Sequence, residues 1–349
     1  MNKFLLRAVL FLSPFIVYAL YILCDLAYIS ANQTGDLEGL GGFSISNSRE
    51  YHKQMFNPKL DQVYFDTFYL DSTYRDVKVL NVGDSFSNQG VTGYVNFMAK
   101  NISGNVLNIS ANMCNPFEVA LGALNSGMLS AAGCKVVVVQ SVGRYLPYRF
   151  ATMRDETEFN LEELISYHNS EVNKPKLVST NKIQQTYEKL LNLAMLKLSE
   201  SPVRTVKLNA DLFSSEPRTL HYYYEDISIC TSLSDEQLDD IASKADYLRG
   251  RFRENNIEFI ILAVPDKYDL YQNNIVENKC APKVILDQIQ SRLSDDFFIN
   301  AKDILLPMIE NGVKDVYLTN DTHWSQIAAE TVGVYLAKSI GDRQAIIEQ

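Results

Sequence analysis

Apolar residues beyond about residue 70 gather in short runs that alternate with longer stretches of mixed character. The clearest run is KVVVVQSV at residues 135–142, which is nearly continuous and rich in β-branched side chains. Such runs are typical of strands buried on both faces of a parallel sheet. The same pattern predicts strands at residues 77–82, 106–109, 135–142, 257–264 and 297–299.

The stretches between these runs carry helical patterns. Residues 234–255 are the strongest, because Ser234 and Gln237 form a capping-box pair ahead of one apolar face. Residues 113–132 and 325–340 are also predicted to be helices. Strands alternating with helices predict an α/β fold, a three-layer α/β/α sandwich around a mostly parallel central sheet.

The first residues have a different pattern. Residues 8–24 contain no charge and follow Lys3 and Arg7. This length approaches a membrane span and is long for a signal peptide, although residues 29–31 (ISA) are a weak cleavage site. We favour a single-pass signal anchor over a cleaved signal. The N-terminus is then in the cytoplasm and the rest is exported, at the inner (cytoplasmic) membrane with a periplasmic domain.

These patterns predict three regions. Residues 1–29 form the N-terminal transmembrane helix, and the polar, glycine-rich residues 30–70 form a linker and entry segment. Residues 71–345 form the main domain, with an insertion at about 150–230 that packs on the core.

Charge and cysteine content narrow the functional classes. The net charge is −10 and no lysine- or arginine-rich run is present, which argues against a nucleic-acid partner. The exported part holds four cysteines, and nearness in sequence favours the pairs Cys114–Cys134 and Cys230–Cys280 over other pairings. Buried free thiols are the alternative. No CxxC or Cys/His cluster is present, so we expect no metal.

The stretch NVGDSFSNQG at residues 81–90 follows the first predicted core strand. Glycine, aspartate and serine build ordinary turns, so this stretch alone does not establish a nucleophile. Ser85, however, falls just beyond the carboxyl end of the strand, where reactive groups of open parallel sheets gather. Ser85, rather than Ser87, is the predicted nucleophile, with Asp84 as a structural residue of the turn.

A nucleophilic serine needs a base and an orienting acid. Of the four histidines, His323 lies in TNDTHWS immediately before the last predicted helix. Asp321 is two residues earlier, so in an extended loop both side chains point the same way. We expect Asp321 to hold the imidazole and His323 to reach Ser85. The alternative is a helix cap with a packed Trp–His pair.

These blocks resemble a known family. GDSF at residues 83–86 and Asp-x-His at 321–323 resemble the first and last blocks of the SGNH (GDSL-type) hydrolase superfamily. The D-x-H-W form resembles the alginate O-acetyltransferase, AlgJ/AlgX-like, group. QSVGRYL at residues 140–146 and VPDKYDLY at 264–271 resemble further segments of that group. The resemblance covers roughly residues 75–340 and is poorest in the insertion.

The resemblance implies acyl transfer through an acyl-serine, with Ser85, His323 and Asp321 as the catalytic residues. We expect the backbone N–H of Ser85 and the side chains of Asn108 or Asn112 to hold the oxyanion. The expected donor or acceptor contacts are Arg144, Tyr145 and Trp324.

The resemblance also implies the partners. The acceptor is a polysaccharide hydroxyl, and no cofactor is bound. The acetyl group, ultimately from acetyl-CoA, comes through a multipass membrane acyltransferase of the MBOAT type. A carbohydrate esterase and a non-catalytic polysaccharide-binding assembly subunit remain the alternatives.

Overall fold

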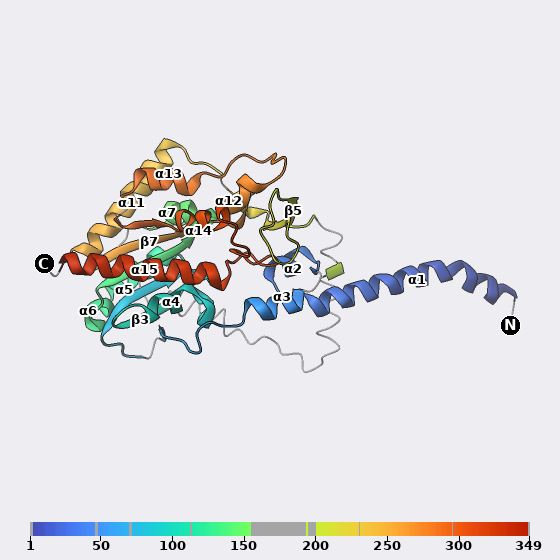
Figure 1. The fold of residues 1–349 in the computed structure, drawn as a ribbon, viewed down its shortest axis with the longest axis horizontal. Helices are drawn as coiled ribbons and strands as arrows, with labels where there is room; N and C mark the ends of the chain where they lie inside the picture. The colour runs from blue at the N-terminus through green and yellow to red at the C-terminus, as the bar shows by residue number, and fades with distance from the viewer. Residues whose placement is uncertain are drawn as a thin grey trace.

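The N-terminal helix extends away from the body of the molecule over most of its length (Figure 1). The computed structural model describes residues 3–45, 48–69, 72–111, 114–154, 193–194, 200–229, 231–294 and 296–347. Helix α1 (Lys3–Asn32) projects from the body of the molecule (Figure 1). Its segment Arg7–Ile29 is long and apolar enough to cross a membrane, with 6% of its most apolar window buried. An N-terminal signal sequence would meet the same criterion.

The body is built on a six-stranded sheet in the order β1-β3-β2-β4-β7-β8, in which every neighbouring pair is parallel. Five of the strands are those predicted from the apolar runs: β2 (Val77–Gly83), β3 (Asn105–Ser110), β4 (Val136–Val142), β7 (Glu258–Val264) and β8 (Phe298–Asn300). The short edge strand β1 (Asp66–Thr67) and the separate antiparallel pair β5 (Val203–Lys207) and β6 (Thr219–Tyr223) were not predicted.

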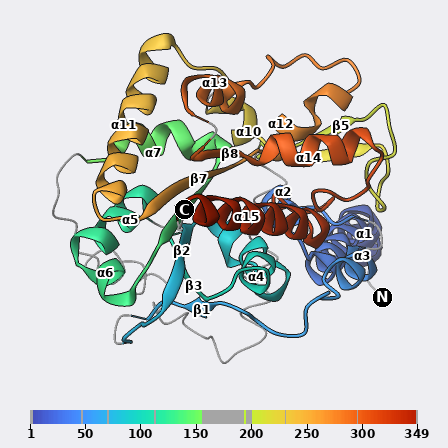
Figure 2. The same cartoon turned by 60° about the vertical axis from the view of Figure 1, so that its left-hand side comes forward.

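Helices cover both faces of the sheet (Figure 2). Because side chains alternate along a strand, Val137 and Val139 of β4 pack into one core and Val136 and Val138 into the other. The first core includes α5 (Pro116–Asn125), α6 (Met128–Ala132), α7 (Leu146–Thr152), α11 (Asp235–Arg253) and α13 (Ile285–Arg292). The second includes α4 (Tyr94–Lys100), α12 (Lys267–Tyr271), α14 (Ala301–Glu310) and α15 (Gln326–Ile347). The predicted three-layer α/β/α fold is therefore confirmed.

The helix boundaries follow local sequence signals. Ser234 caps α11, accepting from the N–H of Gln237 at 3.3 Å, and the Gln237 side chain accepts from the N–H of Ser234 at 3.0 Å. The single helix predicted over residues 113–132 is wrong. Gly127, with φ of +74°, divides it into α5 and α6, since a left-handed residue cannot continue a right-handed helix.

The remaining elements are short. Between α1 and the sheet lie α2 (Asp36–Gly41) and α3 (Ser48–Met55), within the segment predicted as a linker. Other short elements among the described residues include the helix α10 (Glu225–Ser228) and the 3₁₀ turns η1 (Ser85–Asn88), η2 (Gly90–Thr92), η3 (Gly143–Tyr145) and η4 (Gln272–Asn274). Most of the predicted insertion lies outside the described residues.

The cysteine pairing favoured by sequence is not formed. Cys134 is a buried free thiol whose Sγ lies 3.3 Å from the carbonyl of Val136, and burial raises the pKa of this thiol to about 11. The predicted Cys114–Cys134 disulfide is therefore wrong, since the thiol of Cys134 is free and donates to the carbonyl of Val136. Cys280 is a free thiol as well, and Cys230 lies outside the described residues.

Candidate active site

Ser85 opens the η1 turn immediately after β2 (Val77–Gly83) and is exposed. The turn needs glycine before it, since a Cβ on Gly83 would lie 2.5 Å from Oε1 of Gln140 and 2.8 Å from Cβ of Ser87. Ser87, by contrast, is 1% exposed and donates its hydroxyl to the carbonyl of Asp84 at 2.8 Å. The turn therefore presents Ser85 and buries Ser87.

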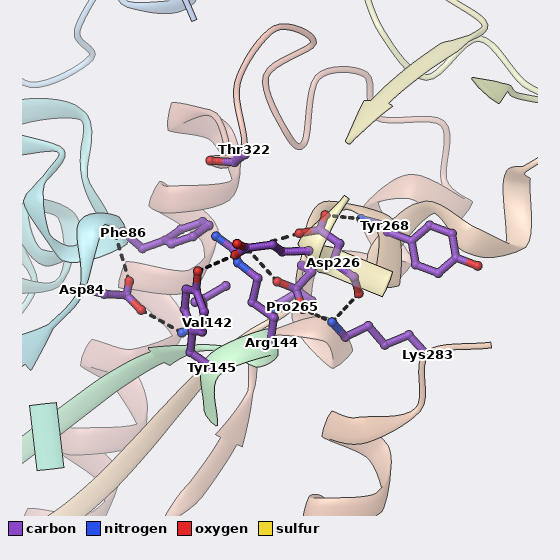
Figure 3. Close-up of polar contacts among 12 residues, drawn as sticks. Asp84, Phe86, Val142, Arg144, Tyr145, Asp226, Pro265, Tyr268, Lys283 and Thr322 are labelled. Atoms are coloured by element: carbon purple, nitrogen blue, oxygen red, sulfur yellow. Dashed lines mark hydrogen bonds and ion pairs between the residues drawn. The ribbon is translucent and has the colours of Figure 1, made fainter. Parts of the chain in front are cut away.

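Asp84 is a buried carboxylate that fixes this turn (Figure 3). It accepts from the N–H of Phe86 at 3.2 Å, the N–H of Val142 at 2.9 Å and Nη1 of Arg149 at 2.8 Å. Burial raises the pKa of Asp84, but the charge and hydrogen bonds of Arg149 outweigh it and hold the pKa below 3.8. Asp84 is thus a structural residue of the turn, as predicted, and it also ties β2 to the end of β4.

Ser85, His323 and Asp321 are joined by two hydrogen bonds. The hydroxyl of Ser85 lies 2.7 Å from Nε2 of His323, although 238 residues separate the two in sequence. Nδ1 of His323 lies 2.7 Å from Oδ1 of Asp321, which also accepts the backbone N–H of His323 at 3.0 Å. The structure therefore brings the predicted base within reach of the predicted nucleophile, with the acid on its far side. Their catalytic roles stay a prediction.

The charges of Asp321 and His323 stabilise each other. Burial raises the pKa of Asp321, but the hydrogen bond to His323 and the charge of the imidazolium lower it by more, to well below 3.8. Burial lowers the pKa of His323, but the hydrogen bond and charge of Asp321 raise it by more, to above 6.5. An ionised acid beside a histidine of raised basicity is the arrangement that general-base catalysis requires.

Trp324 has a structural position. Its side chain is fully buried, packing edge-on against Phe86 with ring centroids 5.0 Å apart. Its indole N–H donates to Oε1 of Gln89 at 2.6 Å. The predicted contact between Trp324 and substrate is therefore wrong: the side chain locks the serine turn to the histidine loop from within the core.

Lys267 supports the loop that carries His323, here called the histidine loop, from inside the core. Its ammonium donates to three backbone carbonyls at 2.6, 2.9 and 3.1 Å, and burial lowers the pKa of Lys267 to about 7. Those carbonyls belong to Leu318, Thr319 and Asp321. The hydroxyl of Tyr271 accepts the N–H of Tyr317 at 3.1 Å. The VPDKYDLY segment therefore scaffolds the loop that carries His323.

Asp36, at the start of α2, also reaches this loop and was missed by the sequence reasoning. Its Oδ1 accepts the backbone N–H of Thr322 at 2.7 Å, and its Oδ2 lies 3.7 Å from Nδ1 of His323. No periodicity or motif relates residue 36 to residue 323. The glycine-rich composition around it is typical of a linker, so only the folded structure shows this contact.

Of the two side chains predicted to bind the oxyanion, the structure describes only Asn108. Asn108 is buried beneath the turn, donating from Nδ2 to the carbonyl of Ser87 at 3.0 Å and accepting from Asn81 at 2.7 Å. It supports the turn from beneath, which contradicts its predicted role as an oxyanion donor. Asn112 lies outside the described residues.

Arg144 and Tyr145 follow β4 at the same edge of the sheet (Figure 3). The guanidinium of Arg144 lies 2.8 Å from Asp266 and 3.3 Å from Asp226, and its side chain is 12% exposed. Its charge is thus paired inside the protein instead of being presented to a ligand. Tyr145 is half-buried and donates its hydroxyl to Oε2 of Glu225 at 2.6 Å, so it remains a candidate for ligand contact.

One cluster of carboxylates and histidine lies beside the proposed nucleophile. Asp36, Asp321 and His323 bring ligand-type atoms within 4.8 Å of one another. The atoms that face each other already share hydrogen bonds with one another and with Thr322. We therefore describe this cluster as a network that orients the imidazole, and we assign no metal to it.

The parallel α/β sheet, the serine after β2 and the Asp-x-His before the last helix are arranged as the resemblance to SGNH hydrolases predicts. Residues 221–349 match the family described as SGNH hydrolase-like domain, acetyltransferase AlgX. The predicted resemblance to this acetyltransferase group is thereby confirmed over that part of the chain. The matched part contains Asp321 and His323 but not Ser85, whose link to them is the hydrogen bond in this structure.

Two curated relatives are named probable alginate O-acetylase AlgJ. The protein from Pseudomonas fluorescens is 29% identical over 128 residues, which cover 35% of this chain and 32% of that protein. The protein from Azotobacter vinelandii is 27% identical over 114 residues, covering 32% and 29%. The match thus spans about a third of the length of these relatives. No solved structure gave a significant match.

Proposed function

We propose that this protein is an exported, membrane-anchored O-acetyltransferase that acetylates hydroxyls of a cell-surface or exported polysaccharide. The observation that carries this proposal is the hydrogen-bonded chain Ser85–His323–Asp321 at the carboxyl edge of the sheet. The names of the matching family and relatives support acetyl transfer as the reaction and a polysaccharide as the acceptor.

In the first half-reaction, Ser85 takes the acetyl group. Its Oγ bonds to the acyl carbon while Nε2 of His323 accepts the hydroxyl proton, and Asp321 stabilises the resulting imidazolium. The backbone N–H of Ser85 is the proposed donor to the tetrahedral oxyanion. The bond to the donor's leaving group then breaks, and that group takes the proton from His323.

In the second half-reaction, a sugar hydroxyl takes the acetyl group from Ser85. His323 accepts the proton of that hydroxyl as its oxygen bonds to the acyl carbon. The bond to Oγ breaks, and His323 returns the proton to Ser85, so the enzyme is regenerated. Tyr145 and Glu225 lie at the same edge of the sheet and are the proposed contacts for the acceptor.

The acetyl donor must come from the membrane side. If α1 spans the inner membrane with Lys3 and Arg7 in the cytoplasm, the domain is periplasmic, whereas acetyl-CoA is cytoplasmic. We therefore propose a multipass membrane acyltransferase as the donor partner. Asp36, which contacts the histidine loop, follows the end of α1 (Lys3–Asn32) closely, which keeps the site near the membrane.

The test is direct detection of the acyl-enzyme. Full-length protein in detergent is incubated with an activated acetyl ester, with and without oligosaccharide, and the Ser85 peptide is examined by mass spectrometry. We expect acetyl on Ser85, its loss in Ser85→Ala, and its retention in Ser87→Ala, the matched neighbouring serine.

The reaction products then distinguish a transferase from an esterase and from a binding subunit. Acetylated oligosaccharide that forms only in the presence of acceptor supports a transferase. Free acetate formed at the same rate with or without acceptor would establish an esterase instead. Acetylation that persists in Ser85→Ala would overturn both, and a wild-type protein that binds polysaccharide without any acyl-Ser85 would indicate a binding subunit.

A further inference from the structure

The segment that follows α1 packs directly on the loop that carries His323. Asp36 accepts from the backbone N–H of Thr322 at 2.7 Å and also from the hydroxyl of Thr322. In return, the N–H of Asp36 donates to Oδ2 of Asp321 at 3.3 Å. Asp36 therefore holds the two residues that immediately precede His323, and with them the path of the loop.

This packing is close and specific. A Cβ on Gly35 would lie 2.0 Å from the carbonyl oxygen of Asn320, so only glycine allows the two backbones to approach this far. The same carbonyl accepts the N–H of Leu37 at 3.1 Å. Glu38, which is fully buried, accepts from Nδ2 of Asn320 at 3.2 Å. The start of α2 is thus fitted to the loop over several successive residues.

Asp36 also faces the imidazole itself. Its Oδ2 lies 3.7 Å from Nδ1 of His323, beside Oδ1 of Asp321 at 2.7 Å. Two other charged groups lie near these residues. The carboxylate of Asp84 helps to raise the pKa of His323, and the charge of Lys267 interacts with those of Asp36 and Asp321. Two carboxylates therefore flank the edge of the ring that points away from Ser85, where they stabilise positive charge on the ring.

We propose that Asp36 is a positioning residue for acyl transfer: it fixes the Thr322 backbone and adds a second carboxylate to the imidazole, so that the segment next to the membrane helix completes the active site. This inference rests on the proposed function, in which His323 takes the proton of Ser85.

The protonation of Asp36 fits this role. Burial and the neighbouring charge of Asp321 raise the pKa of Asp36 to about 6, although the charge of His323 opposes them. Beside a protonated His323, Asp36 is therefore ionised above about pH 6. The carboxylate and the imidazolium stabilise each other in that state.

The test compares Asp36→Asn with wild type and with Glu50→Gln in full-length protein. The asparagine keeps the shape of the side chain and can still accept from Thr322, but it removes the charge. Glu50 is an exposed acid on α3 of the same membrane-proximal segment, so Glu50→Gln controls for loss of one negative charge there.

The first readout is the imidazole pKa of His323, measured by NMR titration, which does not depend on turnover. We expect Asp36→Asn to lower it by about one unit and Glu50→Gln to leave it unchanged. The second is the pH profile of Ser85 acylation by an activated acetyl ester. Its rising limb should move to lower pH in Asp36→Asn, with the plateau rate reduced about tenfold.

The outcomes distinguish the two proposals. A shifted imidazole pKa without any acyl-Ser85 in wild type would retain the placement of Asp36 but overturn acyl transfer. An unchanged imidazole pKa and an unchanged acylation profile in a folded Asp36→Asn would overturn the role of Asp36. Loss of folding in Asp36→Asn, with Glu50→Gln folded, would make Asp36 a structural residue only and overturn it as well.

Discussion

The indole N–H of Trp324 donates to Oε1 of Gln89 at 2.6 Å, and the amide of Gln89 donates back to the carbonyl of Trp324 at 3.3 Å. Residues 235 apart in sequence are thereby paired in the core. Because Gln89 follows the turn of Ser85 and Trp324 follows His323, this pair sets the distance between nucleophile and base. Buried hydrogen bonds between Trp324 and Gln89 therefore help to hold Ser85 and His323 together.

Breaking this pair should cost stability and activity together. Gln89→Leu leaves a buried indole N–H without an acceptor, and we expect it to lower the free energy of unfolding by about 1–3 kcal/mol. A double-mutant cycle with Trp324→Phe, followed by urea denaturation, measures the coupling. We expect about 1 kcal/mol of coupling. Additive effects of the two substitutions would show that the hydrogen bond contributes nothing.

Asp321→Asn should abolish most of the activity without unfolding the protein. The asparagine holds the wrong imidazole tautomer, which in Ser-His-Asp sites lowers turnover by about 10⁴-fold. The measurement is the rate of Ser85 acylation by an activated acetyl ester, with circular dichroism to verify the fold. A loss below about tenfold would show that Asp321 does not orient the base.

The pair of His323 and Asp321 also sets the pH dependence of the acylation rate. His323 must be neutral to accept a proton, and Asp321 raises the pKa of His323 above 6.5. We therefore expect kcat/KM for acylation to rise with pH through that pKa and then level off. In Asp321→Asn the residual rate should level off at lower pH, since the carboxylate no longer raises the pKa. A residual profile with the same midpoint as wild type would contradict this assignment.

Much of the fold follows from local sequence. Residues 135–142 predicted a central strand because a run of four successive β-branched valines is typical of strands buried on both faces. The capping box at Ser234 marked the start of α11. These signals are local, so one sequence is enough to read them.

The parts of the site that sequence did not predict depend on contacts between distant residues. Asp36 and Thr322 meet across 286 residues, and nothing in the composition near either one indicates it. The resemblance implied a substrate contact for Trp324, as part of the D-x-H-W block, but its ring is buried by packing against Phe86 and Tyr94. Asn108 was misassigned for the same reason, since its depth beneath the turn is a tertiary property.

Lys267 should make stability depend on pH in the alkaline range. Burial lowers its pKa from 10.5 to about 7, so between these values the unfolded chain binds more protons than the folded one. The contribution of Lys267 to the free energy of unfolding therefore rises with pH over this range. Urea denaturation at pH 7 and pH 10 should show this rise relative to Lys267→Met.

Lys267→Met should also be less stable than wild type by about 3 kcal/mol at pH 7, because three buried carbonyls lose their donor. Lys53→Met, at an exposed lysine on α3, is the control and should change stability by less than about 0.5 kcal/mol. If both variants keep wild-type stability at both pH values, Lys267 does not hold the histidine loop.

Tyr145 should matter for transfer to the acceptor more than for acylation. Its ring is half-buried at the edge of the sheet, and its hydroxyl donates to Glu225 at 2.6 Å. Tyr145→Ala removes a face on which a sugar ring can stack, whereas Tyr145→Phe removes only the hydroxyl. Tyr335→Ala, at an exposed tyrosine on α15, is the matched control.

We expect Tyr145→Ala to reduce transfer from acyl-Ser85 to oligosaccharide by about tenfold, mainly through a higher KM for the acceptor, while acylation by a small ester keeps most of its rate. Tyr145→Phe should show a smaller loss of the same kind, since the stacking face remains and only the hydrogen bond to Glu225 is lost. The measurement is single-turnover decay of acetyl-Ser85 against oligosaccharide concentration. Equal losses in both half-reactions would instead show that Tyr145 supports the turn of Ser85. The route would be Arg149, whose guanidinium lies 5.8 Å from the centre of the tyrosine ring and donates to Asp84.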